Sequence, residues 1–102
     1  MSQERTVQLR RYRIVEGELS GFLEWWRSRL LPARVAFGFV LETALVVPET
    51  DEFVWAVSVE GDEAAFTALD AAWAASRERV VAFEGVPQRV ASMDLRIAVP
   101  AI

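Results

Sequence analysis

The 102-residue sequence contains no cysteine, histidine, lysine or asparagine. Without cysteine and histidine it cannot form disulfides, use a thiolate or imidazole in catalysis, or bind zinc or haem through those ligands. Without lysine it cannot form a Schiff base with a substrate. Chemistry is left to carboxylates, arginine, serine, threonine, glutamine, one tyrosine and four tryptophans. We therefore expect no bound cofactor.

The chain also lacks a net positive charge and long apolar runs. Its net charge is −4, with 11 arginines as its only basic residues, which argues against a nucleic-acid partner because phosphate binding requires a basic surface. No apolar run approaches the roughly 18 residues of a membrane span, and the first residues, M-S-Q-E-R-T, do not resemble a signal peptide. We expect a cytoplasmic protein without nucleic-acid or membrane partners.

What the chain does have is apolar side chains. Hydrophobic residues make up 53% of it, including four Trp and six Phe. A single domain of this size, here residues 1–102, buries only about 60–70% of the surface that its unfolded chain exposes. The surplus apolar surface favours burial against a partner.

The periodicity predicts six main elements. Residues 6–14 alternate as a strand, and a helix follows E-G-E, with Gly17 as its N-cap and an end near 37–38. Its apolar stripe is well spaced, and Pro32 predicts a kink or break. A hairpin is predicted within 37–59, followed by a helix with Asp62 as its N-cap. A short helix over 77–83 is predicted to follow Ser76 and to bury Val80. The last predicted element is a strand. The stripe of the first helix comprises Leu19, Phe22, Leu23, Trp26 and Leu30.

The hairpin within residues 37–59 is apolar on both faces. One layer of helices can cover only one face of a sheet, so the second face also requires burial. The element order β-α-β-β-α-β predicts an α+β, ferredoxin-like fold with an antiparallel four-stranded sheet, in which the first and third strands are central. Two such sheets stacked face to face would form a homodimer.

Strand alternation predicts the content of each face. We expect the helices to cover Val7, Leu9, Met93, Leu95 and Ile97. The opposite face is predicted to gather polar side chains, namely Gln8, Arg10, Tyr12, Asp94 and Arg96.

This polar cluster is the candidate ligand pocket, together with Trp55 from the hairpin. Arginine could hold an anionic or enolate oxygen and Tyr12 could donate a proton, while Trp55 could stack on a flat ligand. The alternative is a structural Arg–Asp network inside a dimer, with Trp55 in the core. The sequence identifies no catalytic residue. Glu49, Asp51 and Glu52 lack the ligand spacing of a calcium loop, so we expect a solvated hairpin tip and no metal site.

Several motifs together resemble NIPSNAP-like proteins over residues 6–99. They are L-R-R-Y at 9–12 followed by E-G at 16–17, the helix L-x-x-F-L-E-W-W-x-x-x-L-L-P at 19–32, D-E-F-V-W at 51–55 and the Ala- and Trp-rich second helix. The resemblance implies the dimeric α+β barrel fold. That superfamily also contains cofactor-independent monooxygenases, muconolactone-isomerase-like enzymes and haem-degrading enzymes. The resemblance transfers no catalytic residue.

Two functions follow as hypotheses. The first is a homodimer that binds a small apolar or aromatic anion in a cavity, either between sheet and helices or between the two sheets. The second is a cofactor-independent monooxygenase or isomerase acting on an aromatic or enolisable substrate, with orientation and oxyanion stabilisation supplied by the protein. The absence of histidine and asparagine counts against the second hypothesis, because those residues commonly move protons in such sites.

Overall fold

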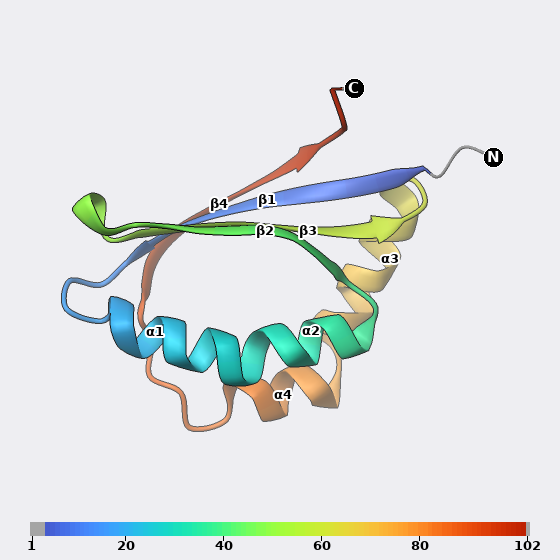
Figure 1. Ribbon diagram of the computed structural model, residues 1–102. Coiled ribbons are helices and arrows are strands. Elements are labelled where there is room, and N and C mark those ends of the chain that lie inside the picture. Colours follow the sequence, from blue (N-terminus) through green and yellow to red (C-terminus); the bar gives the residue numbers. More distant parts are fainter. Residues whose placement is uncertain (1–3, 102) are drawn as a thin grey trace.

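The computed structural model describes residues 4–101 and has the predicted α+β, ferredoxin-like architecture. The sheet is antiparallel with strand order β2-β3-β1-β4, so the first and third strands are central as predicted. The helices lie on one side of it (Figure 1). The strands are β1 (Arg5–Ile14), β2 (Val40–Val47), β3 (Glu52–Glu60) and β4 (Val90–Ala98). The helical segments are α1 (Leu19–Trp25), η1 (Trp26–Leu30), α2 (Leu31–Phe37), η2 (Pro48–Thr50), α3 (Glu63–Ala74) and α4 (Arg77–Phe83).

The first helix runs through Pro32 without breaking. A π-helical turn, η1, joins α1 to α2 just before the proline. Proline has no N–H to bond the carbonyl four residues earlier, and a local π turn is one way to accommodate such an interruption. The helix starts at Leu19, with Gly17 in the preceding turn instead of at the N-cap. Its predicted end is confirmed, since Gly38 follows Phe37 with a φ of 127°.

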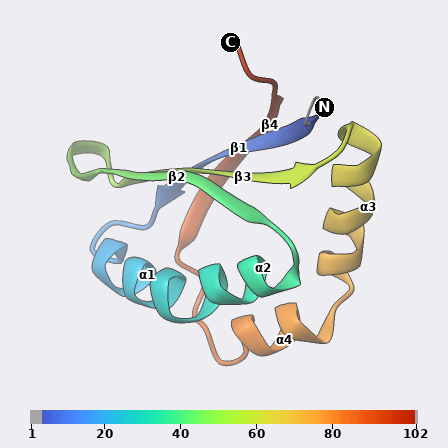
Figure 2. The same ribbon diagram turned by 45° about the vertical axis from the view of Figure 1, so that its right-hand side comes forward.

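The second helical region confirms both predicted caps. The Asp62 carboxylate accepts a hydrogen bond from the Ala65 N–H, and the Ser76 hydroxyl accepts one from the Arg79 N–H. The prediction that Val80 is buried is wrong, because its side chain is 63% exposed. The short helix α4 packs through Ala82 instead, and it lies against α2 (Figure 2).

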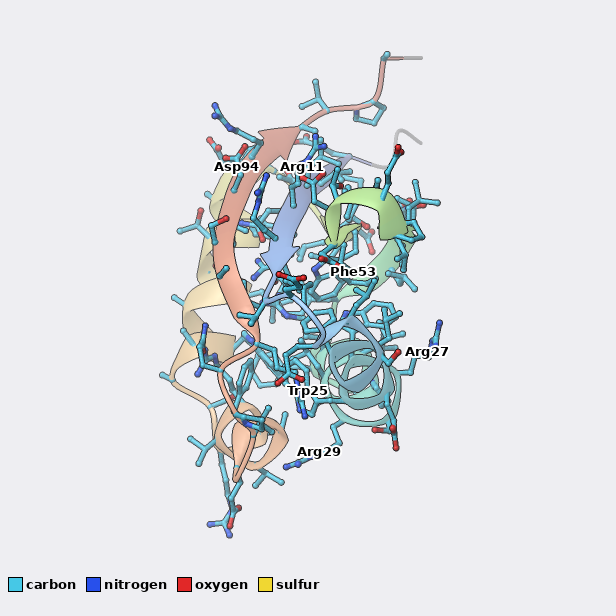
Figure 3. The ribbon with its side chains drawn as sticks, turned by 90° about the vertical axis from the view of Figure 1, so that its left-hand side faces the viewer. Arg11, Trp25, Arg27, Arg29, Phe53 and Asp94 are labelled. Carbon is cyan, nitrogen blue, oxygen red and sulfur yellow. The ribbon has the colours of Figure 1, made fainter. Side chains whose placement is uncertain are left out.

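An aromatic core fills the space between sheet and helices. Trp25 points into it from α1 and Phe53 from β3 (Figure 3). The rings meet mostly edge to face, an arrangement that aromatic pairs favour. The fully buried large side chains are Phe22, Phe39, Phe53, Trp55, Phe66 and Trp73.

The predicted faces of β1 are reversed in the structure. Gln8, Arg10 and Tyr12 point toward the helices and are buried, whereas Val7 and Leu9 lie on the side away from the helices, called the outer face below. Alternation shows which residues share a face but not which face turns inward. On the inner face, Arg10 and Tyr12 border a cavity, and Gln8 accepts a hydrogen bond from Arg10.

The apolar residues of β4 lie on the predicted face of the sheet but are less buried than predicted. Met93, Leu95 and Ile97 pair with Tyr12, Arg10 and Gln8, so they lie on the helix-facing side as predicted. They are nevertheless 42–51% exposed, because the helices leave most of this edge strand uncovered.

Within residues 4–101, no helix is both long and apolar enough to cross a membrane.

Candidate ligand-binding site

A cavity of about 230 Å³ lies between the sheet and the helices. Its walls combine aromatic and aliphatic side chains from the sheet, from the helices and from the segment before β4. Its interior is lined by the buried residues Tyr12, Phe22, Trp25, Leu30 and Trp73, and its mouth by the exposed residues Pro87, Gln88 and Met93.

Four arginines also line this cavity: Arg10 from β1, Arg34 from α2, Arg79 from α4 and Arg89 from the segment before β4. No aspartate or glutamate is among the lining residues. This concentration of positive charge lies inside a protein with a net charge of −4. A cleft lined by one sign of charge, with low-dielectric walls, attracts ligands of the opposite sign.

Arg34 is the most unusual of the four. It is 5% exposed, and its Nε and Nη1 groups have no hydrogen-bond partner. Its guanidinium lies over three aromatic rings, 4.7 Å from Phe39, 5.2 Å from Trp73 and 5.6 Å from Trp55. The nearest carboxylate oxygen is 3.9 Å from Nη1, on the partly exposed Asp70. Burial lowers the pKa of Arg34 to about 10, and the positive charge of Arg10 adds to the shift, so Arg34 is still charged at neutral pH.

Arg10 is held by its own strand. Its Nε donates a 2.8 Å hydrogen bond to the Tyr12 hydroxyl oxygen, and its Nη1 donates to the Gln8 side-chain carbonyl. The three side chains alternate along β1, which places them in a row on one face. The guanidinium also lies 5.4 Å from the Trp55 ring. These contacts fix Arg10 in position beside the cavity.

No protein-family model matches the sequence, and no curated protein matches it either. Solved structures do match. An uncharacterised NIPSNAP domain protein from Burkholderia xenovorans has a TM-score of 0.81 at 18% identity, over 94% of each chain. A NIPSNAP family protein from Agrobacterium tumefaciens has a TM-score of 0.85 at 16% identity, over 98% of this chain and 89% of the other. The fold is that of the NIPSNAP proteins.

A further solved structure with a lower TM-score has the same fold under a different name. A Nitrosomonas europaea protein, provisionally named an antibiotic biosynthesis monooxygenase, has a TM-score of 0.69 at 12% identity, over 99% of this chain and 94% of the other. The resemblance to NIPSNAP-like proteins is thus confirmed for the fold. At these identities the similarity carries no information about activity.

The NIPSNAP-like fold brings together four of the six candidate pocket residues. Arg10 and Tyr12 line the cavity, and Gln8 holds Arg10. Trp55 is fully buried behind the guanidinium groups of Arg10 and Arg34 and does not line the cavity. The expected stacking of Trp55 on a ligand therefore has no support in this geometry.

Asp94 and Arg96 are separated from the other four. Their place in a cluster with Arg10 was wrong, because Arg10 pairs with Leu95 across the sheet while Asp94 pairs with Arg11. Asp94 and Arg11 lie on the outer face (Figure 3), where Arg96 donates a 3.0 Å hydrogen bond to Asp94. The two residues form an exposed ion pair of their own.

The acidic hairpin tip is also part of this outer region. The Glu52 carboxylate accepts hydrogen bonds from Arg11 at 2.8 Å and from the Thr50 hydroxyl at 2.6 Å. These bonds, the one from Arg11 most strongly, lower the pKa of Glu52 to about 2. In the part of the chain that the structure describes, no group of three or more acidic side chains is arranged to hold a metal ion.

Three lining arginines were not predicted from the sequence. Arg34 lies four residues after Leu30 and so continues the buried stripe of the first helix. A charged residue on such a stripe is the sequence signal that could have identified Arg34 as a candidate site residue. Arg79 and Arg89 occupy ordinary polar positions near a helix start and in a loop. Only the packing of α4 and the following segment against the other elements brings them to the cavity.

Proposed function

We propose that this protein binds a small apolar or aromatic anion in the cavity between its sheet and its helices. The observation that carries the proposal is Arg34, a buried guanidinium with two unpartnered nitrogen groups in a cavity without acidic lining. A buried donor without a partner costs about 1–3 kcal/mol. A ligand carboxylate would accept a hydrogen bond from an unpartnered donor of Arg34 and offset its buried positive charge, since hydrogen bonds between a guanidinium and a carboxylate are among the strong ones.

The walls suggest the rest of the ligand. The cavity is lined mostly by apolar and aromatic side chains, including Phe22, Trp25, Trp73 and Phe83. Such walls favour an apolar or flat ligand body, while the few polar groups orient it. An aromatic carboxylate combines both properties and is the simplest probe.

The proposal is tested by comparing benzoate with benzamide, which has nearly the same shape but no charge. Isothermal titration calorimetry on the wild-type protein should show benzoate binding at least about 10-fold more tightly than benzamide, because only the carboxylate pairs with Arg34. The exposed arginine of the same helical region, Arg27, serves as a control, and Arg27→Gln should not change either affinity. Equal affinity for the two compounds, or binding of neither, would contradict the proposal.

We further propose that the outer face of the sheet is covered by a second copy of the chain. Leu9, Val40 and Leu45 are exposed there, Leu45 by 61%. Apolar residues grouped on one face of a sheet are typical of a homodimer interface, and a standard interface buries about 800 Å² on each partner.

Light scattering after size exclusion should therefore give twice the 11.5 kDa chain mass for the wild type. Leu45→Arg should yield a folded monomer, because two charges would be buried at a symmetric interface. Val80→Arg is the matched control, since Val80 is equally exposed but lies on α4, on the other side of the molecule. A wild-type monomer at micromolar concentration would refute the dimer.

A further inference from the structure

We propose that the ligand of this cavity is a dianion, with one anionic group bound at Arg34 in the interior and the second bound between Arg79 and Arg89 near the mouth. This inference rests on the proposed function, since it assigns a second charge to the same ligand. It is carried by the charge content of the cavity and by the positions of these two arginines.

The positive charges of the cavity outnumber the negative charges available to them. Within residues 4–101, Arg10, Arg79 and Arg89 form no ion pair, and Arg34 has only the 3.9 Å contact with Asp70. A monoanion together with Asp70 would balance two of the four guanidinium groups. A second anionic group would balance three, which reduces the repulsion among the arginines.

Arg79 belongs to the same electrostatic group as the interior arginines. Its positive charge, like that of Arg10, contributes to the lowered pKa of Arg34. Its guanidinium lies 4.4 Å from the ring of Phe83, which also lines the cavity. The side chain is half-buried, between the enclosed interior and the exposed mouth.

Arg89 reaches the cavity from a different element, the segment before β4. Its Nε is buried and has no hydrogen-bond partner. The side chain lies against Gly21 of α1, where an added Cβ would be 3.2 Å from Nε. The absence of a side chain at residue 21 therefore makes room for this guanidinium beside the cavity.

The test uses calorimetry with benzoate and a series of diacids that place the second carboxylate at increasing distance: terephthalate, 4-carboxyphenylacetate and 3-(4-carboxyphenyl)propionate. At least one diacid should bind wild-type protein about 10-fold more tightly than benzoate, as expected for an added charge-assisted contact. In the double variant Arg79→Gln/Arg89→Gln the preference, measured as the ratio of diacid to benzoate affinity in the same variant, should fall to about 1.

Arg77→Gln is the matched control, because Arg77 is an exposed arginine of α4 that does not line the cavity. It should retain the preference for the diacid. Each single variant, Arg79→Gln or Arg89→Gln, should lose part of the preference, so the test does not depend on the double variant folding.

The outcomes separate the two proposals. If benzoate binds but no diacid binds more tightly, or if the preference survives in the double variant, the dianion inference is wrong and the proposed function stands. If neither benzoate nor any diacid binds the wild-type protein, the proposed function itself fails and the inference fails with it.

Discussion

Arg34→Met is expected to weaken the binding of benzoate by at least about 100-fold while changing the free energy of unfolding by no more than about 1 kcal/mol. The affinity should fall because the substitution removes the positive charge and the buried, unpartnered donors to which a carboxylate would bind. Hydrogen bonds between charged partners contribute about 1.5–3 kcal/mol each, and one such loss already reduces affinity by about 10- to 100-fold.

The small expected change in stability results from two opposing effects. The folded-state pKa of Arg34 is about 10, below the ordinary value of 12.5. The charged side chain therefore costs roughly 3 kcal/mol at every pH below 10, and the cost disappears only as the pH rises from 10 toward 12.5. Three ring contacts oppose this cost, each contributing about 0.5–2 kcal/mol. Methionine removes both effects and keeps an apolar side chain in place.

Calorimetry and urea denaturation measure the two quantities in parallel. Arg27→Met is the matched control, because Arg27 lies on the same long helix and points away from the body of the protein (Figure 3). It should alter neither quantity. If Arg34→Met instead lowered the free energy of unfolding by 3 kcal/mol or more, about the loss expected from breaking a buried structural pair, Arg34 would be structural and the proposed site would lose its main support.

Trp55→Ala is expected to lower the free energy of unfolding by about 3–5 kcal/mol, the range measured for large core residues. Trp55 is 0% exposed and lies at the centre of the sheet, in β3. Its ring is 5.4 Å from Trp26 and 6.2 Å from Tyr12, in edge-to-face contacts. It also supports the guanidinium groups of Arg10 and Arg34.

Because a domain of this size has a total stability of about 5–15 kcal/mol, this loss removes a large fraction of it, and the urea midpoint of Trp55→Ala should fall markedly. Urea denaturation of this variant beside Val54→Ala provides the comparison, since Val54 is adjacent in β3 but lies on the outer face and is only partly buried. Val54→Ala should cost less than about 1.5 kcal/mol. A similar loss for both variants would show that Trp55 does not organise the core.

Local sequence features predicted the elements well. The caps at Asp62 and Ser76 are confirmed because each side chain bonds a backbone N–H three residues away, which depends only on neighbouring residues. The end of the first helix at Gly38 is confirmed for a similar reason, since glycine tolerates a positive φ. There are two exceptions. Gly17 lies in the turn before the first helix instead of at its N-cap, and at Pro32 the long helix absorbed the missing hydrogen bond as a π turn instead of breaking.

The candidate site was only partly predictable. Alternation along β1 correctly grouped Gln8, Arg10 and Tyr12, but their polarity suggested the wrong face. Polar side chains are expected to avoid the helix-covered side of a sheet, unless they border a cavity or satisfy one another there. Arg10 does both, through its bonds to Gln8 and Tyr12 and its place on the cavity wall.

The order of the elements, the caps at Asp62 and Ser76 and the antiparallel ferredoxin-like sheet follow from the amino-acid sequence, because backbone preferences and hydrophobic periodicity act over a few residues. Three features do not follow from the sequence. They are the direction in which each face of β1 turns, the separation of Asp94 and Arg96 from Arg10, and the meeting of Arg34, Arg79 and Arg89. They depend on strand register and on how the helices pack against the sheet. The charged cavity is therefore a property of tertiary packing, and its arginines become a candidate site only when α2, α4 and β1 are brought together.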